Sequence, residues 1–132
     1  MDTVSRAKLK KRGLKRFVKS FSYAIDGLKY AFKYEQNMTA HIISTVGVII
    51  LGFLFHISFA EWLIIALIIG LVIATELINT SIEAVVDLAC PEINSVAKVA
   101  KDTASAAVFV FAMVAVVIAL IIFVPKIIGL FI

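Results

Sequence analysis

The fold is decided by residues 62–87, which read WLIIALIIGLVIATELINTSIEAVVD. The first fourteen of these residues carry no charge, and the acids Glu76, Glu83 and Asp87 follow in the second half. A helix needs about 20 apolar residues to cross a hydrocarbon core about 30 Å thick. We therefore predict a transmembrane helix over residues 62–88, with its charged groups confined to one end.

The composition of the whole chain agrees with a membrane protein. Hydrophobic residues make up 62% of its 132 residues, and the mean hydropathy is +1.06. A soluble domain has an apolar share of about 45–50%, and a small domain cannot bury the excess. Two further apolar runs predict helices over about 40–60 and 98–124, because lipid leaves unpaired backbone groups without partners. The prediction is one all-α membrane domain over residues 1–132.

The segment before the first apolar run is basic and amphipathic. Apolar residues recur every three or four positions over residues 14–36, with lysines between them. This pattern is typical of a helix lying on an anionic membrane surface, although simple packing or anchoring would explain most of its residues. Residues 1–13, dense in lysine, are expected to form a basic mobile tail. We expect no nucleic-acid partner.

The distribution of basic residues predicts the orientation. Two of the thirteen lysines and arginines lie between the second and third runs, and none lies in the loop between the first and second. Cytoplasmic loops carry the excess of Lys and Arg, so the N-terminus and the second loop are predicted to be cytoplasmic. The ten that precede the first run are Arg6, Lys8, Lys10, Lys11, Arg12, Lys15, Arg16, Lys19, Lys29 and Lys33.

The polar residues of the second span form a stripe. At about 100° per residue, Glu83 and Asp87 each lie about 20° from Glu76, and Asn79 lies about 60° away. One ionised carboxylate in hydrocarbon costs on the order of 3 kcal/mol. Three on one face need cations, a metal ion or a wet cavity, so the stripe indicates a functional site more than a structural one.

Three more charged residues are predicted near the stripe. Lys101 and Asp102 enter the third span on the same side of the membrane, and Lys101 suits phosphate or ion-pair contact better than a stop-transfer role. Glu35 stands where the surface helix turns into the first span, and could join Glu83 as a metal ligand. Mg²⁺ is usually held by one or two carboxylates together with phosphate oxygens.

The two histidines and the overall residue set limit the possible chemistry. His41 and His56 lack partners at metal-ligand spacing and are expected at the membrane interface. Acids with a lysine suit Mg²⁺-assisted phosphoryl transfer from ATP to a lipid alcohol, although no Walker loop is present in the sequence. An ion-coupled transporter also uses intramembrane acids, and a structural or pore-forming subunit stays open as well.

Two sequence motifs indicate a specific protein family. Residues 76–87 fit E-x-x-N-[ST]-x-I-E-x-x-x-D, and residues 100–108 (AKDTASAAV) fit A-K-D-x-x-[SA]-[AG]-A-V. Together, in this order, they make the chain resemble the prokaryotic diacylglycerol kinase family of small trimeric membrane kinases, from about residue 16 to 124. The resemblance implies a homotrimer with sites shared between protomers, in the cytoplasmic membrane of a bacterium.

The resemblance also implies residue roles. Glu76 would be the general base that takes the proton of the lipid hydroxyl, and Glu35 and Glu83 would hold the Mg²⁺ bound to ATP. Further catalytic residues would be Asn79, Asp87, Lys101 and Asp102. Nucleotide contacts would come from Arg16, Tyr23, Glu35, Glu83, Glu92, Lys101 and Asp102, and lipid contacts from Arg16, Glu76 and Ser105.

Substrate and nucleotide preference are less defined. Many relatives have a tyrosine–histidine pair where this chain has Ile93 and Asn94, so the resemblance implies a different contact with adenine here. Residues 32–38, 61–62 and 123–126 look like the Gram-positive branch, whose members are similar to undecaprenol kinases. Undecaprenol is therefore the favoured acceptor, and diacylglycerol is the alternative.

Overall fold

The computed structural model describes residues 13–131, and every regular element in that range is an α-helix. The helices are α2 (Leu14–Tyr34), α3 (Gln36–Leu54), α4 (Phe59–Ala89) and α5 (Ser95–Ile128). The last three are long and apolar enough to cross a membrane, as predicted. The chain divides into two compact units, the first ending at Tyr34 and the second beginning at Glu35. Each unit is described by itself, and the predicted tail lies outside the described residues up to Gly13.

The first unit consists of α2. The helix begins after Gly13, whose carbonyl accepts the N–H groups of Arg16 and Phe17. The rings of Phe17 and Phe21 meet edge to face, with centroids 5.3 Å apart. It ends two residues before the predicted position 36, because Glu35 has an extended backbone (φ −96°, ψ 115°) and starts α3 as its N-cap. The location of α2 on a membrane surface stays a prediction.

A tight turn joins α3 to α4. The predicted end of the first span at residue 60 is wrong, since α3 ends at Leu54 and α4 begins at Phe59. The left-handed backbone of His56 (φ 47°) turns the chain. Ser58 then starts α4 with a capping box: its Oγ accepts the Glu61 N–H at 3.3 Å, and Glu61 Oε2 accepts the Ser58 N–H at 2.6 Å. Such reciprocal bonds satisfy backbone donors that the first turn leaves free.

Close packing holds the two helices together beside this turn. A Cβ atom on Gly52 of α3 would lie 2.6 Å from Cη2 and 2.8 Å from Cζ2 of Trp62 on α4. The glycine therefore lets the indole rest directly on the α3 backbone. Next to it lies the buried apolar cluster of this unit, to which the turn, α4 and α5 contribute; its members are Ile57, Ile65, Ile122 and Phe123.

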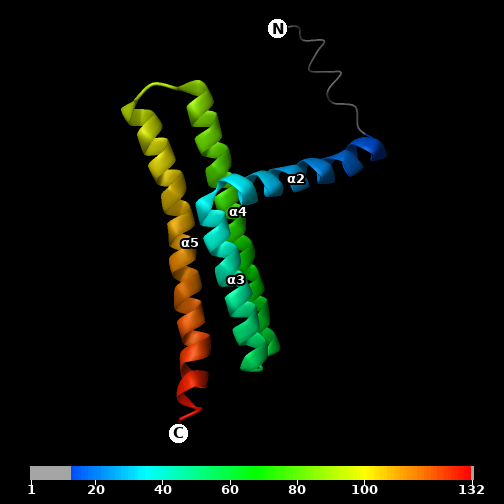
Figure 1. Ribbon diagram of the computed structural model, residues 1–132, viewed down its shortest axis with the longest axis vertical. Coiled ribbons are helices and arrows are strands. Elements are labelled where there is room, and N and C mark those ends of the chain that lie inside the picture. Colours follow the sequence, from blue (N-terminus) through cyan, green and yellow to red (C-terminus); the bar gives the residue numbers. More distant parts are fainter. Residues whose placement is uncertain (1–12, 132) are drawn as a thin grey trace. The chain divides into compact units, whose positions relative to one another are not determined.

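Helices α4 and α5 are neighbours (Figure 1). An ion pair joins them near each end. Lys126 Nζ lies 3.2 Å from Glu61 Oε1 in a half-buried pair, and Lys101 Nζ lies 2.9 Å from Asp87 Oδ1. Glu61 and Asp87 are 26 residues apart on α4, which is about 39 Å of helix at about 1.5 Å per residue. This separation is close to the full thickness of a bilayer with its headgroups, about 40–45 Å.

Candidate active site

The predicted stripe of acids lies on α4 and passes from buried to exposed. Glu76 is fully buried and Asn79 is 4% exposed. Glu83, two turns further, is partly exposed, and the side chain of Asp87 is 66% exposed. One helical face therefore connects a water-excluded carboxylate with an accessible one, as the 100° periodicity predicts.

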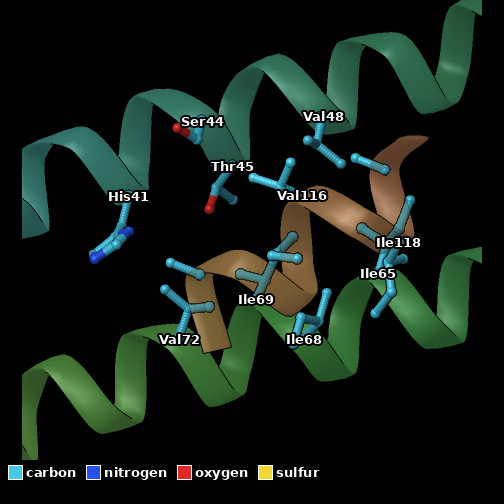
Figure 2. Close-up of a pocket in the computed structure, with 13 residues that line it drawn as sticks. His41, Ser44, Thr45, Val48, Ile65, Ile68, Ile69, Val72, Val116 and Ile118 are labelled. Carbon is cyan, nitrogen blue, oxygen red and sulfur yellow. The ribbon is translucent and has the colours of Figure 1, made fainter. Parts of the chain in front are cut away.

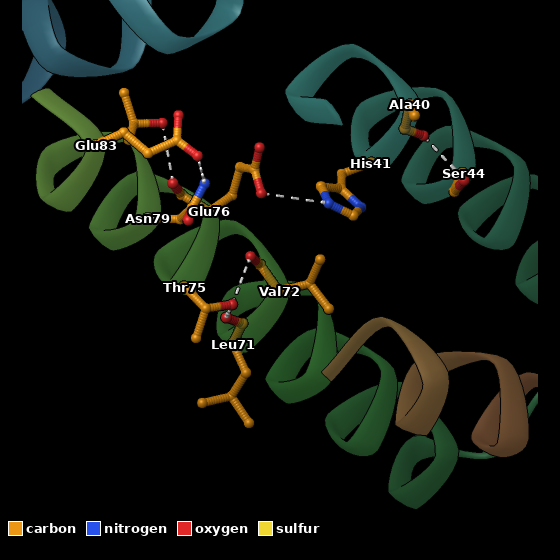
Figure 3. Close-up of polar contacts among 10 residues, drawn as sticks. Ala40, His41, Ser44, Leu71, Val72, Thr75, Glu76, Asn79 and Glu83 are labelled. Carbon is orange, nitrogen blue, oxygen red and sulfur yellow. Dashed lines mark hydrogen bonds and ion pairs between the residues drawn. The ribbon is translucent and has the colours of Figure 1, made fainter. Parts of the chain in front are cut away.

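The carboxylates of this stripe differ in their hydrogen-bond partners (Figure 3). Asn79 Nδ2 donates to Glu83 Oε1 at 3.2 Å, which orients the Glu83 carboxylate. Glu35 and Glu83 lie close enough to Glu76 for their charges to act on it, and the Asn37 amide is also nearby. Neither Glu76 oxygen has a hydrogen-bond partner with acceptable geometry within the described part of the chain. Both oxygens of the buried Glu76 carboxylate can therefore still accept a hydrogen bond.

The predicted lysine meets the stripe at its exposed end. Lys101 Nζ donates to both Asp87 oxygens, at 2.9 and 3.2 Å, so the two motifs come together as expected. Asp102 pairs with Lys98 one turn earlier on α5 and does not contact the stripe. Both ion pairs are accessible, which leaves their charges available to an anionic ligand.

The other predicted residues are not brought into this cluster. Ser105 is exposed on α5, and Glu92 is exposed in the loop between α4 and α5. Arg16 and Tyr23 are exposed on α2, in the other unit, where Lys19 Nζ lies 5.6 Å from the Tyr23 ring centroid. Their contribution to a site stays a prediction.

The structure adds a residue that sequence reasoning missed. His41 was expected at the membrane interface, without partners at metal-ligand spacing, and its Nε2 lies 3.8 Å from Glu76 Oε2. Figure 3 shows Glu76 pointing from α4 toward this imidazole on α3. Periodicity within one helix cannot reveal such a pair, because it depends on how two helices are aligned.

A cavity of about 210 Å³ opens beside His41, between α3, α4 and α5 (Figure 2). Ser44 and Thr45 join His41 in its polar part, and the remaining lining is aliphatic. The α5 side is formed partly by the small residues Ala112, Ala115 and Ala119. Small side chains at that position leave room for a ligand as well as for a close helix contact.

The acids of this site suit a metal delivered with a phosphate ligand. Among residues 13–131, no group of three His, Cys, Asp or Glu side chains forms a metal cage. Glu35 and Glu83, whose charges both act on Glu76, would give Mg²⁺ the one or two carboxylates it usually takes from protein, with phosphate oxygens and water completing the shell. The donor set fits a metal that arrives with a nucleotide.

Comparisons with known proteins agree with this geometry. The family model of prokaryotic diacylglycerol kinase matches residues 22–123. The chain is 44% identical over 113 residues to an undecaprenol kinase of Bacillus subtilis, covering 86% of this chain and 92% of that protein. It is 40% identical over 98 residues to a diacylglycerol kinase of Helicobacter pylori (74% and 77% covered). It is also 37% identical over 112 residues to one of Synechocystis (84% and 64%).

The family match covers all three long apolar helices up to residue 123, together with both sequence motifs. It favours phosphoryl transfer over the transporter and the structural subunit that the sequence alone left open. The chain belongs to the prokaryotic diacylglycerol kinase family and is a membrane-embedded lipid kinase.

Proposed function

We propose that this protein transfers the γ-phosphate of ATP to the hydroxyl of undecaprenol, giving undecaprenyl phosphate. The observation that carries the proposal is the Glu76 carboxylate, which is fully buried and has both oxygens unpartnered within the described residues. It lies 3.8 Å from His41, and His41 lines a mostly apolar cavity. A base placed there meets a hydroxyl that arrives on an apolar chain. The identity of 44% to an undecaprenol kinase supports this acceptor.

The reaction places one proton on Glu76. The O–H bond of the alcohol breaks and its proton moves to a Glu76 oxygen, while the alcohol oxygen bonds to the γ-phosphorus. The bond from that phosphorus to the bridging oxygen breaks, and ADP leaves with both electrons of the bond. Such transfer depends on positioning and on charge stabilisation more than on covalent chemistry. Glu76 then returns its proton to water.

The nucleotide is proposed to lie at the exposed end of the stripe. Lys101 would contact its phosphates, exchanging Asp87 for a phosphate oxygen, and Asn79, Asp87 and Asp102 would orient groups around them. Glu35 and Glu83 would hold Mg²⁺, which neutralises charge on the transferring phosphate when bound. Arg16, Tyr23 and Glu92 are proposed to contact the nucleotide, and Ser105 the lipid.

The working assembly is proposed to be a homotrimer in the bacterial cytoplasmic membrane. Two features support an orientation with the polar end of α4 at the cytoplasm. Ten of the thirteen lysines and arginines precede α3, and cytoplasmic segments carry this excess. Lys98 and Lys101 lie at the same end as the acids, where ATP and Mg²⁺ are available.

Diacylglycerol is the second candidate acceptor. Six of the similar proteins bear the name diacylglycerol kinase. Both lipids present one primary hydroxyl on apolar chains, so the same base can serve either. The difference must come from how the apolar part is accommodated.

The test is phosphate transfer from labelled Mg·ATP by the purified protein in mixed micelles, with undecaprenol and diacylglycerol offered in parallel. Label should enter undecaprenol faster. Glu76→Gln should lower turnover by about 10²–10⁴-fold, since a general base contributes that much, with ATP binding kept. Glu61→Gln is the matched control, because glutamine also completes a capping box.

Three results would each overturn a part of the proposal. If the folded trimer labels neither lipid, the kinase function fails, and ion flux in liposomes without nucleotide would then support a transporter. If Glu76→Gln phosphorylates lipid at the wild-type rate, Glu76 is not the base. A rate higher with diacylglycerol than with undecaprenol would reassign the acceptor.

A further inference from the structure

Three buried polar atoms face one another without partners at the boundary between α3 and α4. They are His41 Nε2 and both carboxylate oxygens of Glu76, and within the described residues none makes a hydrogen bond. The shortest separation, 3.8 Å from Nε2 to Oε2, is too long for a direct hydrogen bond. Buried polar groups in folded proteins are almost always paired. These atoms therefore have unused hydrogen-bonding capacity that a group from outside the chain can fill.

We propose that the acceptor hydroxyl binds between them, and that His41 is a second substrate-contacting residue. The inference rests on the proposed function. A hydroxyl has one donor and two acceptor positions, so its oxygen can accept from His41 Nε2–H while its proton points to Glu76. An oxygen about 2.8 Å from each atom spans the 3.8 Å gap in a bent arrangement.

The cavity supplies the approach for the rest of the lipid (Figure 2). It begins at His41 and continues between aliphatic side chains of three helices, including Val48, Ile65 and Val72. Ser44, the hydroxyl nearest in sequence, already donates to the Ala40 carbonyl at 2.9 Å. The imidazole is the donor that lies 3.8 Å from the Glu76 carboxylate, so it is the one placed to share an oxygen with that base, and the carbons next to the hydroxyl would lie in the aliphatic part.

The role of His41 differs from that of Glu76. As the proton moves to Glu76, the alcohol oxygen gains negative charge, and hydrogen bonds to a charged oxygen are stronger than those to a neutral one. His41 keeps its own proton throughout, so no extra proton has to be accounted for. The imidazole holds the oxygen in line and stabilises the charge that develops before the new P–O bond is complete.

The chain's two histidines provide a matched comparison. His41→Asn shortens the side chain so that its amide no longer reaches the position of Nε2, whereas His41→Gln returns an N–H close to it. His56→Asn removes the other histidine at a left-handed position that asparagine tolerates. We expect kcat/KM for undecaprenol to fall about 10- to 100-fold in His41→Asn, because misplacing a reacting group has that effect.

The KM for ATP should stay at the wild-type value in all three variants. In His41→Gln, at least a third of the decrease in log(kcat/KM) seen in His41→Asn should be recovered. In His56→Asn, kcat/KM should equal the wild-type value. Wild-type kcat/KM in His41→Asn would overturn the role of His41 while leaving the kinase function intact. No phosphorylation by the wild-type protein would instead overturn the proposed function.

A second measurement avoids changing His41 at all. In the His56→Asn protein, ¹⁵N-histidine labelling leaves a single imidazole, whose Nε2 signal can be followed by NMR. Adding undecaprenol should shift that signal, and a polyprene hydrocarbon of the same length without oxygen should not. Equal shifts with both compounds, or none with either, would overturn the hydroxyl contact even where His41→Asn fails to fold.

Discussion

Glu76 and Glu83 share one face of α4 and one charge, but they have different surroundings. Glu76 is fully buried with two unpartnered oxygens, whereas Glu83 is partly exposed and accepts a hydrogen bond from Asn79. A buried, free carboxylate suits proton transfer in a site that excludes water. An oriented carboxylate near the aqueous phase suits metal binding, because metal-ligating carboxylates are usually hydrogen-bonded.

This contrast predicts different kinetic defects. Glu83→Gln should raise the KM for Mg·ATP by about tenfold or more, since loss of a ligand or of its hydrogen-bonded support typically costs 10–100-fold. Its KM for the lipid should change little. Steady-state kinetics with each substrate varied in turn would show this. An unchanged KM for Mg·ATP would remove Glu83 from the metal site.

Lys101 should affect catalysis much more than stability. Its ion pair with Asp87 is accessible to solvent, and exposed pairs contribute about 0–1 kcal/mol. We expect Lys101→Met to lower kcat/KM for ATP about 100-fold, on the scale of a lost charge that stabilises the transition state, with Tm nearly unchanged. Lys98→Met, which breaks the neighbouring pair with Asp102, is the control. Equal losses of activity in both variants would argue for a general effect of surface charge.

At the scale of the elements, alanine substitutions at two glycines of α3 distinguish the effect of packing on stability from the effect of helix propensity. A Cβ on Gly52 would meet Trp62 at 2.6 Å, but one on Gly47 would meet nothing within 4 Å. Gly52→Ala should therefore lower the unfolding free energy by about 1–3 kcal/mol, as overpacking does. Gly47→Ala should be neutral or stabilising by up to about 1 kcal/mol. Thermal unfolding in the same detergent measures both, and a Gly52→Ala protein as stable as wild type would contradict the tight contact.

The sequence predicted which segments form helices better than where they end. Continuous hydropathy marks the three spans because lipid tolerates little else. Phe55, Ile57 and Phe59 continue that hydropathy through the turn, so the first span was extended beyond Leu54. Hydropathy indicates which residues are surrounded by lipid, but it does not indicate where the backbone leaves the helix and turns. The Ser58–Glu61 capping box was a readable signal for the start of α4.

The site was predictable only where it lies on one helix. The stripe from Glu76 to Asp87 follows from a fixed rotation per residue, which any α-helix has. The contact between His41 and Glu76 depends on the register of α3 against α4, which side-chain packing sets. A single sequence contains no direct record of that register. The approach of Lys101 to Asp87 could be expected because both lie next to one short connection.

At the scale of the whole molecule, the proposed trimer predicts complementation between inactive chains. Glu76→Gln and Lys101→Met each remove one function. If neighbouring protomers build each site together, co-expressed chains should form some sites with both wild-type groups and regain measurable phosphorylation. Each variant expressed alone should keep the loss of about 100-fold or more predicted above. Light scattering should confirm trimers, and co-purification through a different affinity tag on each variant should confirm that they are mixed. Mixed trimers without regained activity would place both groups of a site in one protomer.

The three spans also differ in length, and this has a consequence for the surrounding membrane. α3 has 19 residues, compared with 31 in α4 and 34 in α5, so it reaches about 28 Å at about 1.5 Å per residue. That is barely the thickness of an average hydrocarbon core, about 30 Å. The longer helices can tilt to match a different bilayer, but tilting α3 only shortens its reach. Because α3 carries His41, acyl-chain length in the host membrane becomes a control on the rate: lipids that thicken the bilayer should slow phosphorylation without any change in the protein.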